Sequence, residues 1–97
     1  MRSHWERLGF DSETFHLFTR MRGARTRLNL LHALSKPMDR LQLAQELDLD
    51  WGAVDYHVDL LSSRGLVQED GTYGRVKMYR RTRYGESLLA LLGEFRG

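Results

Sequence analysis

The sequence predicts a mainly α fold with a small β-hairpin (α+β), in the order four helices, two strands and a final helix. The central observation is that Val54, Val58 and Leu61 lie at i, i+4 and i+7, the spacing of the buried stripe of an amphipathic helix. Gly65 follows directly, and glycine readily adopts the left-handed conformation that ends a helix. We therefore expect a helix over residues 51–64 and a strand that begins at Leu66.

Capping residues and turn glycines predict the other elements. Asp11 or Ser12 is suited to cap a first helix, and Asp39 and Thr82 are suited to cap later ones, because their side-chain oxygens accept hydrogen bonds from free backbone N–H groups. A hairpin loop containing Gly71 and Gly74 separates two stretches with strand character. The expected helices cover about 13–21, 24–34, 40–47 and 83–95, and the expected strands cover about 66–69 and 76–81.

Composition favours one small domain. The chain has 97 residues, of which 41% are hydrophobic, so we expect a single domain over 1–97, with an N-terminal extension over 1–22 and a C-terminal helix over 82–97. It contains no cysteine, which excludes disulfides, thiolate metal ligands and cysteine nucleophiles. No apolar run approaches the roughly 20 residues of a membrane span, and the first residues lack the apolar region of a secretion signal. We expect a cytoplasmic protein without membrane contact.

Charge is distributed unevenly along the chain. Residues 1–40 carry eight basic and four acidic side chains, residues 41–70 carry one and seven, and residues 71–97 carry six and two. Basic ends fit a partner with a phosphate backbone, whereas the acidic centre argues against one. The same pattern also occurs on ordinary solvated surfaces.

The predicted order of elements is that of a winged helix-turn-helix domain, and the chain resembles ArsR-type regulators of the small archaeal and prokaryotic kind. The resemblance spans about residues 24–92. It is carried by the stretches Leu43-Ala44-x-x-Leu47-x-Leu49, Val54-x-Tyr56-His57-Val58-x-x-Leu61, Gly65-Leu66-Val67, Tyr79 and Thr82-x-x-Gly85. Winged helices also serve as protein-interaction modules, so the fold is indicated more specifically than the function.

The resemblance implies a transcriptional regulator that binds duplex DNA through a recognition helix over 51–64 and a basic wing over 70–81. The start of the recognition helix would enter the major groove, and the wing would lie over phosphates or in the minor groove. The expected DNA contacts are Trp51, Gly52, Ala53, Asp55 and Tyr56 on the helix, Tyr73, Arg75 and Lys77 on the wing, and Arg40 and Gln42 as phosphate ligands at the start of the preceding helix.

Two acidic residues depart from the family pattern. Asp55 and Asp59 stand where the family usually has serine and a polar or basic residue. A carboxylate can accept a hydrogen bond from cytosine N4, but it repels phosphates. The alternative is therefore a protein-interaction module that docks a basic partner through its acidic fourth helix and Trp51.

We expect no enzyme activity, no metal and no cofactor. The sequence has no glycine-rich phosphate loop, nucleophile elbow or His-Glu-x-x-His motif. It also lacks the cysteines and the Asp-His pairs through which many ArsR-type sensors bind ions. His57 is expected to be a core residue bonded to the backbone, and no two of the histidines at 4, 16 and 32 have ligand spacing on one helix.

Apolar residues near both ends of the chain predict a homodimer. The family commonly dimerises through its terminal helices, and a two-fold dimer would present two recognition helices to DNA half-sites. The alternative is a monomer in which the first helix covers the last. The expected dimerisation residues are Phe15, Phe18, Leu88, Leu89, Leu92 and Phe95.

Overall fold

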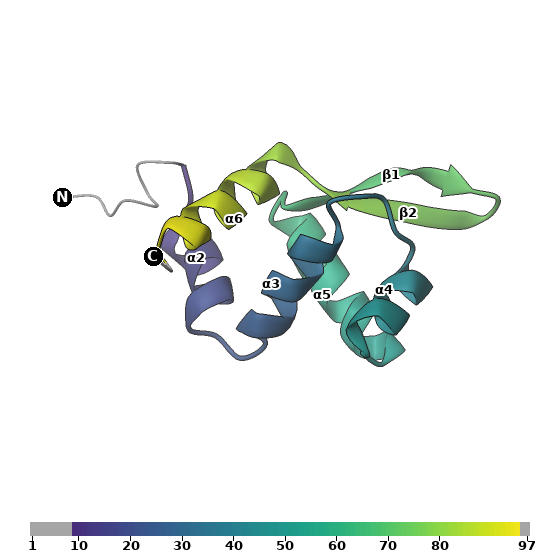
Figure 1. Cartoon of the computed structure of the whole chain (residues 1–97), viewed down its shortest axis with the longest axis horizontal. Helices are drawn as coiled ribbons and strands as arrows, with labels where there is room; N and C mark the ends of the chain where they lie inside the picture. The colour runs from purple at the N-terminus through teal and green to yellow at the C-terminus, as the bar shows by residue number, and fades with distance from the viewer. Residues whose placement is uncertain (1–8, 96–97) are drawn as a thin grey trace.

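The computed structural model describes residues 9–95, and for Glu94 and Phe95 only the backbone. Within that range the chain forms five helices and one two-stranded antiparallel hairpin, in the predicted order (Figure 1). The hairpin projects from one end of the helical body, while α2 and the end of α6 lie at the other end. The elements are α2 (Ser12–Thr19), α3 (Ala24–Ala33), α4 (Arg40–Leu47), α5 (Trp51–Ser63), β1 (Val67–Tyr73), β2 (Val76–Arg81) and α6 (Arg83–Phe95).

Side-chain caps fix the helix starts where the sequence predicts them. The Asp11 carboxylate accepts from the Thr14 amide at the start of α2 at 2.6 Å, and the Asp50 carboxylate accepts from the Ala53 amide at 2.8 Å at the start of α5. At the start of α6, the Thr82 hydroxyl accepts from the Gly85 amide at 3.0 Å. Each bond satisfies an amide that the first turn of a helix leaves free.

The core lies between α3, α5 and α6. Val54, Val58 and Leu61 are fully buried, which confirms the predicted inward face of α5. α3 contributes apolar side chains from two adjacent stripes, and Leu88 of α6 is likewise fully buried. Gly65 has the predicted left-handed conformation (φ 73°), and it turns the chain from α5 toward β1.

The hairpin is longer than the sequence predicts. β1 begins at Val67 rather than Leu66 and extends to Tyr73, so Gly71 lies inside a strand and not in the loop. The register gains one residue on β1 between Glu69 and Thr72, a bulge that the left-handed Gly71 (φ 81°) allows. The turn itself is Gly74 and Arg75, a two-residue connection whose first position has positive φ. Pairing therefore continues past the point where the sequence pattern breaks.

Backbone and side-chain bonds attach the base of the hairpin to the helices. Met38, just before α4, exchanges two backbone hydrogen bonds with Tyr79 of β2, at 3.0 and 2.8 Å. The Arg81 amide donates to Leu34 O at 3.0 Å, and its guanidinium reaches Leu31 O at 3.3 Å. Arg81 thus occupies the carbonyls at the end of α3.

Gly85 tests the packing of α6 on the start of the hairpin. A Cβ at this position would lie 2.5 Å from the Leu66 carbonyl oxygen. We expect Gly85→Ala to lower the free energy of unfolding by about 1–3 kcal/mol, despite the higher helix propensity of alanine. The matched control is Gly93→Ala in the same helix, where no described atom lies within 4 Å of the position that a Cβ would take. It should stabilise by about 0.5–1 kcal/mol. Urea denaturation of both variants measures the difference, and equal effects would contradict the packing argument.

Candidate nucleic-acid interface

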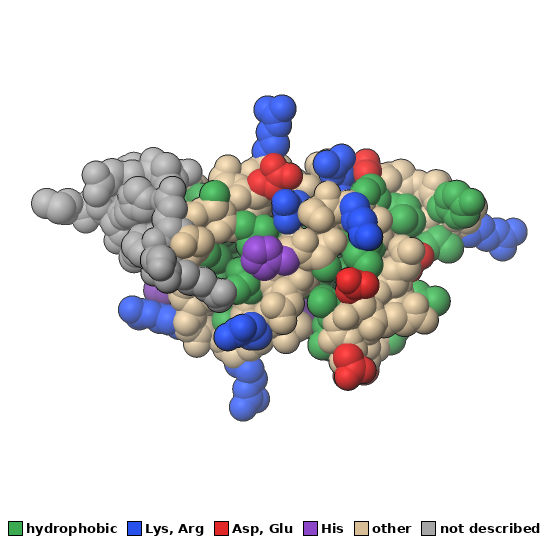
Figure 2. Space-filling model, viewed as in Figure 1, with side chains coloured by type: hydrophobic (Ala, Val, Ile, Leu, Met, Phe, Trp, Pro, Cys, Tyr) green, Lys and Arg blue, Asp and Glu red, His purple; other side chains and the backbone are tan. Residues whose placement is uncertain are grey.

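The start of α5 presents its side chains to solvent next to the hairpin. Trp51 is 52% exposed and Tyr56 is 62% exposed, while Gly52 is exposed and Ala53 is half-buried. At the outer end of the hairpin, Tyr73 is 83% exposed. The part of the molecule around the hairpin shows hydrophobic side chains at the surface together with Lys or Arg side chains (Figure 2). Trp51 of α5 and Lys77 of the hairpin line one open groove, so these two parts of the predicted interface lie side by side.

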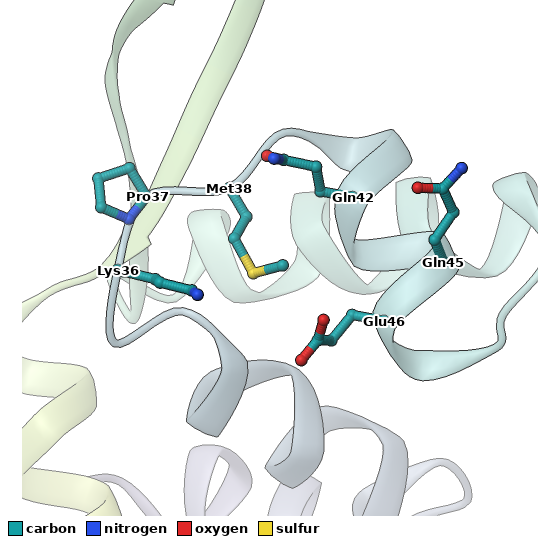
Figure 3. Close-up of a pocket in the computed structure, with 6 residues that line it drawn as sticks. All are labelled: Lys36, Pro37, Met38, Gln42, Gln45 and Glu46. Atoms are coloured by element: carbon teal, nitrogen blue, oxygen red, sulfur yellow. The ribbon is translucent and has the colours of Figure 1, made fainter.

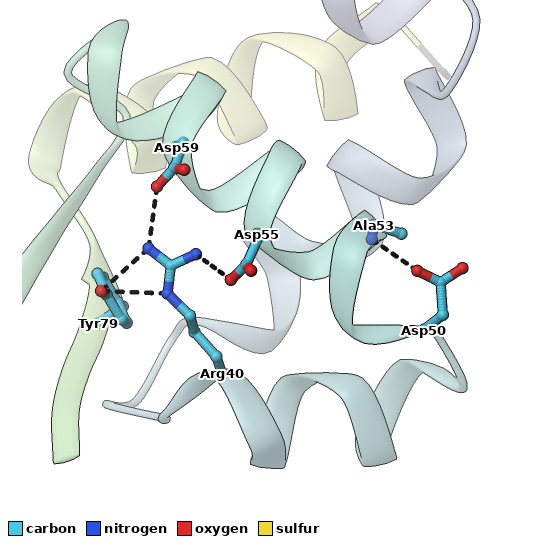
Figure 4. A network of polar contacts seen from close by, with 6 residues as sticks. All are labelled: Arg40, Asp50, Ala53, Asp55, Asp59 and Tyr79. Carbon is cyan, nitrogen blue, oxygen red and sulfur yellow. Dashed lines mark hydrogen bonds and ion pairs between the residues drawn. The ribbon is translucent and has the colours of Figure 1, made fainter.

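Arg40, the first residue of α4, joins α4, α5 and β2 (Figure 4). Its Nη1 donates to Asp55 Oδ1 at 2.6 Å, and its Nη2 donates to Asp59 Oδ1 at 2.9 Å. Nε and Nη2 both reach the Tyr79 hydroxyl, at 3.2 and 3.1 Å. The guanidinium carbon lies 4.9 Å from the centre of the Tyr79 ring. We call these four residues the Arg40 clamp.

The Arg40 clamp changes the electrostatic character of α5. Burial acts to lower the pKa of Arg40, but hydrogen bonds with Asp59, Tyr79 and Asp55 outweigh it and raise the pKa above the usual value. The guanidinium therefore stays charged and offsets one of the two negative charges that depart from the family pattern. Arg40 was expected to bind phosphate, yet its three nitrogens all donate within the chain. The charge that supported an acidic docking helix is thus reduced internally.

The wing cations are mostly paired across the hairpin. Lys77 lies 3.4 Å from Glu69, and Arg80 lies 3.8 Å from Asp70. These exposed pairs are weak, so they exchange readily for other anions. Arg75, in the turn, makes no ion pair with any residue that the structure describes.

Gln42, the second predicted phosphate ligand, belongs to the cap of α4. Its side-chain oxygen accepts from the Asp39 amide at 2.9 Å, while the Asp39 carboxylate accepts from the Gln42 amide at 2.7 Å. Gln42 also lines an open hollow of about 520 Å³ with Met38 and Glu46 (Figure 3). None of the residues lining this hollow is among the other predicted DNA contacts.

Behind α5, a buried arginine attaches α2 to the core. Arg27 of α3 is 2% exposed, which is rare for an arginine. Its Nε donates to Leu17 O at 2.7 Å and its Nη2 donates to Arg22 O at 2.8 Å, so it satisfies carbonyls at and beyond the end of α2. Burial lowers its pKa.

His57 lies against this arginine on the buried side of α5. The sequence predicted a bond to the backbone, but its buried Nδ1 has no hydrogen-bond partner within residues 9–95. Burial, and then the charge of Arg27, lower the pKa of His57. Gly23 packs so closely that a Cβ there would lie 2.8 Å from Arg27 Nη1 and 3.1 Å from His57 Cε1. Burial and the neighbouring Arg27 charge therefore both favour the neutral imidazole over its cation.

Comparison with solved structures shows regulators of transcription among the similar folds. The reduced form of YodB from B. subtilis superposes with a TM-score of 0.74 at 18% identity, covering 99% of this chain and 89% of that one. BldR from Sulfolobus solfataricus gives 0.69 at 24% identity, covering 93% and 67%. A MarR family regulator from Silicibacter pomeroyi gives 0.63 at 28% identity, covering 88% and 64%. No protein-family model matches the chain, and no match to a curated protein reaches significance.

The chain has the winged-helix fold. In this fold, α4 and α5 form the helix-turn-helix, with α5 as its second helix, and β1 and β2 form the wing. The fold predicted from sequence is confirmed, while the ArsR-type subclass is not distinguished from other winged-helix regulators.

The predicted dimerisation residues lie on α2 and α6, on the helical body and not on the wing. Most of them are at least half-buried within one chain. Phe18, Leu88 and Leu92 are buried, and Phe15 and Leu89 are half-buried. Their burial within one chain reduces the apolar surface that remains for a second copy. The side chain of Phe95 lies outside the described residues. The dimer stays a prediction.

The described part of the chain contains neither a metal-binding cluster nor a membrane-spanning helix. Over the part of the chain that the structure describes, no three His, Asp or Glu residues are grouped so that they could hold a metal ion. No helix between residues 9 and 95 has both the length and the apolar character needed to cross a membrane.

The Arg40 clamp is the functional feature that sequence reasoning missed. Asp55 and Asp59 are four positions apart, which places both carboxylates on one side of α5. That spacing signals a shared cationic partner, but only the fold identifies the partner as Arg40, fifteen positions before Asp55.

A double-mutant cycle tests the Arg40 clamp. The variants Arg40→Ala, Asp55→Ala and their combination should give a coupling energy of about 1 kcal/mol in urea denaturation, because the bond is charge-assisted and partly buried. The control cycle uses Lys77 and Glu69, an exposed pair at 3.4 Å. The coupling energy of this exposed pair should be about 0.2 kcal/mol. Equal coupling in both cycles would show that the Arg40 clamp adds nothing beyond a surface ion pair.

The neutral state of His57 predicts a pH dependence of stability. Its pKa in the folded chain is below the usual 6.5, so the unfolded chain binds a proton that the folded chain does not. Stability should therefore fall as the pH drops below about 6.5, until the lowered pKa is reached. His57→Gln should flatten this slope, whereas His32→Gln, at an exposed site, should leave it unchanged. Urea midpoints measured on both sides of that pH give the slopes, and an unchanged slope in His57→Gln would refute the assignment.

Proposed function

We propose that this protein is a transcriptional regulator that binds duplex DNA through the start of α5 and through its wing. The observation that carries the proposal is the open face formed by Trp51, Gly52 and Tyr56 beside an exposed hairpin, on a fold shared with transcriptional regulators. A helix of this kind fits the major groove, and an adjacent hairpin then reaches the flanking backbone.

Charge supports the proposal once internal pairs are considered. Asp55 and Asp59 are bonded to Arg40, so their repulsion of phosphates is reduced. Arg75 at the tip of the wing has no competing carboxylate among the described residues, and Lys77 is held by only one exposed pair. Both cations are therefore available for phosphates.

The finer assignments belong to the same proposal. The motifs of the sequence support an ArsR-type regulator without metal ligands, and a cytoplasmic homodimer would place two α5 helices on adjacent half-sites. Phe15 and Leu89 keep part of their surface exposed and are the residues through which a second copy would be contacted, together with Phe95. Sedimentation equilibrium of the full chain gives the oligomeric state directly.

Charge reversal on the wing tests DNA binding. Titration of a labelled duplex from upstream of the gene should give an affinity that falls with salt, because phosphate contacts release counterions. Arg75→Glu combined with Lys77→Glu should weaken binding by at least about tenfold and reduce the salt slope by about two.

The matched control changes two cations far from the wing. Arg20, just after α2, and Arg25 of α3 are exposed, so Arg20→Glu combined with Arg25→Glu makes the same change in net charge without touching the proposed interface. It should retain the affinity of the unchanged protein. Equal losses in both variants would reflect net charge alone, and absence of binding at low salt would refute the proposal.

A further inference from the structure

An apolar groove separates the start of α5 from the wing. It has a cavity volume of about 390 Å³, and its walls include Leu41 of α4, Trp51 of α5, and Val76 and Tyr79 of β2. Leu41, Trp51 and Val76 are each about half exposed, at 54%, 52% and 47%. Carbon surface of this size, brought together from three elements, is open to solvent in the part of the molecule proposed to meet DNA.

Most polar groups around this groove are already bonded within the chain. Arg40 is held by Asp55, Asp59 and Tyr79, and Asp39 accepts the amide of its own helix. What remains to face an occupant is mainly aliphatic and aromatic surface, together with the indole N–H of Trp51 and the cation of Lys77 at the wall formed by the wing.

Among base edges in the major groove, one offers an apolar group. Thymine carries a C5-methyl group there, and apolar side chains recognise it by contact, whereas the other positions present donors and acceptors. A cation beside the groove complements the phosphates that flank any base. An apolar wall with an adjacent lysine thus matches a methyl-bearing base edge in a duplex.

We propose that the groove formed by Leu41, Trp51 and Val76 recognises the C5-methyl group of thymine in duplex DNA. This inference rests on the proposed function, because it needs the start of α5 to lie in the major groove. It assigns base recognition to carbon contacts of Trp51 and its neighbours, and it assigns Asp55 and Asp59 to positioning α5 through Arg40 rather than to contact with bases.

Removal of the methyl group alone tests the inference. The probes are an alternating A·T duplex and the same duplex with deoxyuridine in place of every thymine, so that every register presents either a methyl group or none. The full-length protein should bind the thymine duplex more tightly, by about fourfold for each methyl group that becomes buried. Fluorescence anisotropy at fixed salt measures both affinities.

Two variants separate the groove from other effects of uracil on the duplex. Trp51→Ala should lose the preference and bind both duplexes with equal affinity. Met21→Ala removes another exposed apolar side chain, 46% exposed and located between α2 and α3, and should keep the preference. Circular dichroism establishes that both variants are folded before the titrations.

The outcomes distinguish this inference from the proposed function. Salt-dependent binding of both duplexes with equal affinity would overturn thymine recognition and leave the regulator proposal intact. A preference that persists in Trp51→Ala would place the discrimination elsewhere and would also overturn the inference. Binding to neither duplex at low salt would count against the proposed function itself, and capture of a basic protein by the same groove would replace it.

Discussion

The end of this protein that carries the start of α5 and the wing depends on one guanidinium group. Arg40 begins α4, yet its bonds go to α5 and to β2, so three elements that are separate in the sequence share one charged group. Without it, two carboxylates would face each other one turn apart on α5, and the wing would contact the helices mainly through its base. The Arg40 clamp therefore holds α5 against the wing and reduces the negative charge along it.

A second arginine has a comparable role at the opposite side of α5. Arg27 is buried and donates to backbone carbonyls at the end of α2 and just beyond it. Among the described residues these carbonyls, and no acidic side chain, stabilise its charge. The C-cap residue of α5, Arg64, bonds to Glu13 in the first turn of α2. α2 is thus held at both ends, by α3 and by α5, and the resulting contacts bury the N-terminal apolar residues that otherwise suggested an interface.

The local features of the fold were predictable from sequence because they depend on neighbouring residues. The caps at Asp11, Asp39, Asp50 and Thr82 lie where side-chain type and helical spacing place them. The length of β1 was not predictable, because pairing with β2 carries it through Gly71 where propensity alone would end the strand. The partners of the charged side chains were missed for a similar reason.

The charge counts of the sequence treat every arginine and aspartate as part of the surface. Arg27 turns inward to backbone carbonyls that no side-chain pattern reveals, and Arg40 bonds to residues fifteen and nineteen positions later on α5. The candidate site was therefore predictable in its location, on α5 and the wing, but not in which side chains remain free to act. Asp55 illustrates the difference. It lies on the predicted contact helix, but its carboxylate is already bonded to Arg40.

The bulge at Gly71 divides the wing mechanically into two parts. Below it, the Met38–Tyr79 bridge and the Arg81 contacts with α3 hold the strands to the body. Above it, only the pairs of Thr72 with Lys77 and Tyr73 with Val76 hold the two strands together. The outer segment is consequently held by fewer contacts with the body than the base is, although Lys77 reaches back to Glu69 across the bulge. The tip of the wing is therefore the part of the hairpin that the core constrains least.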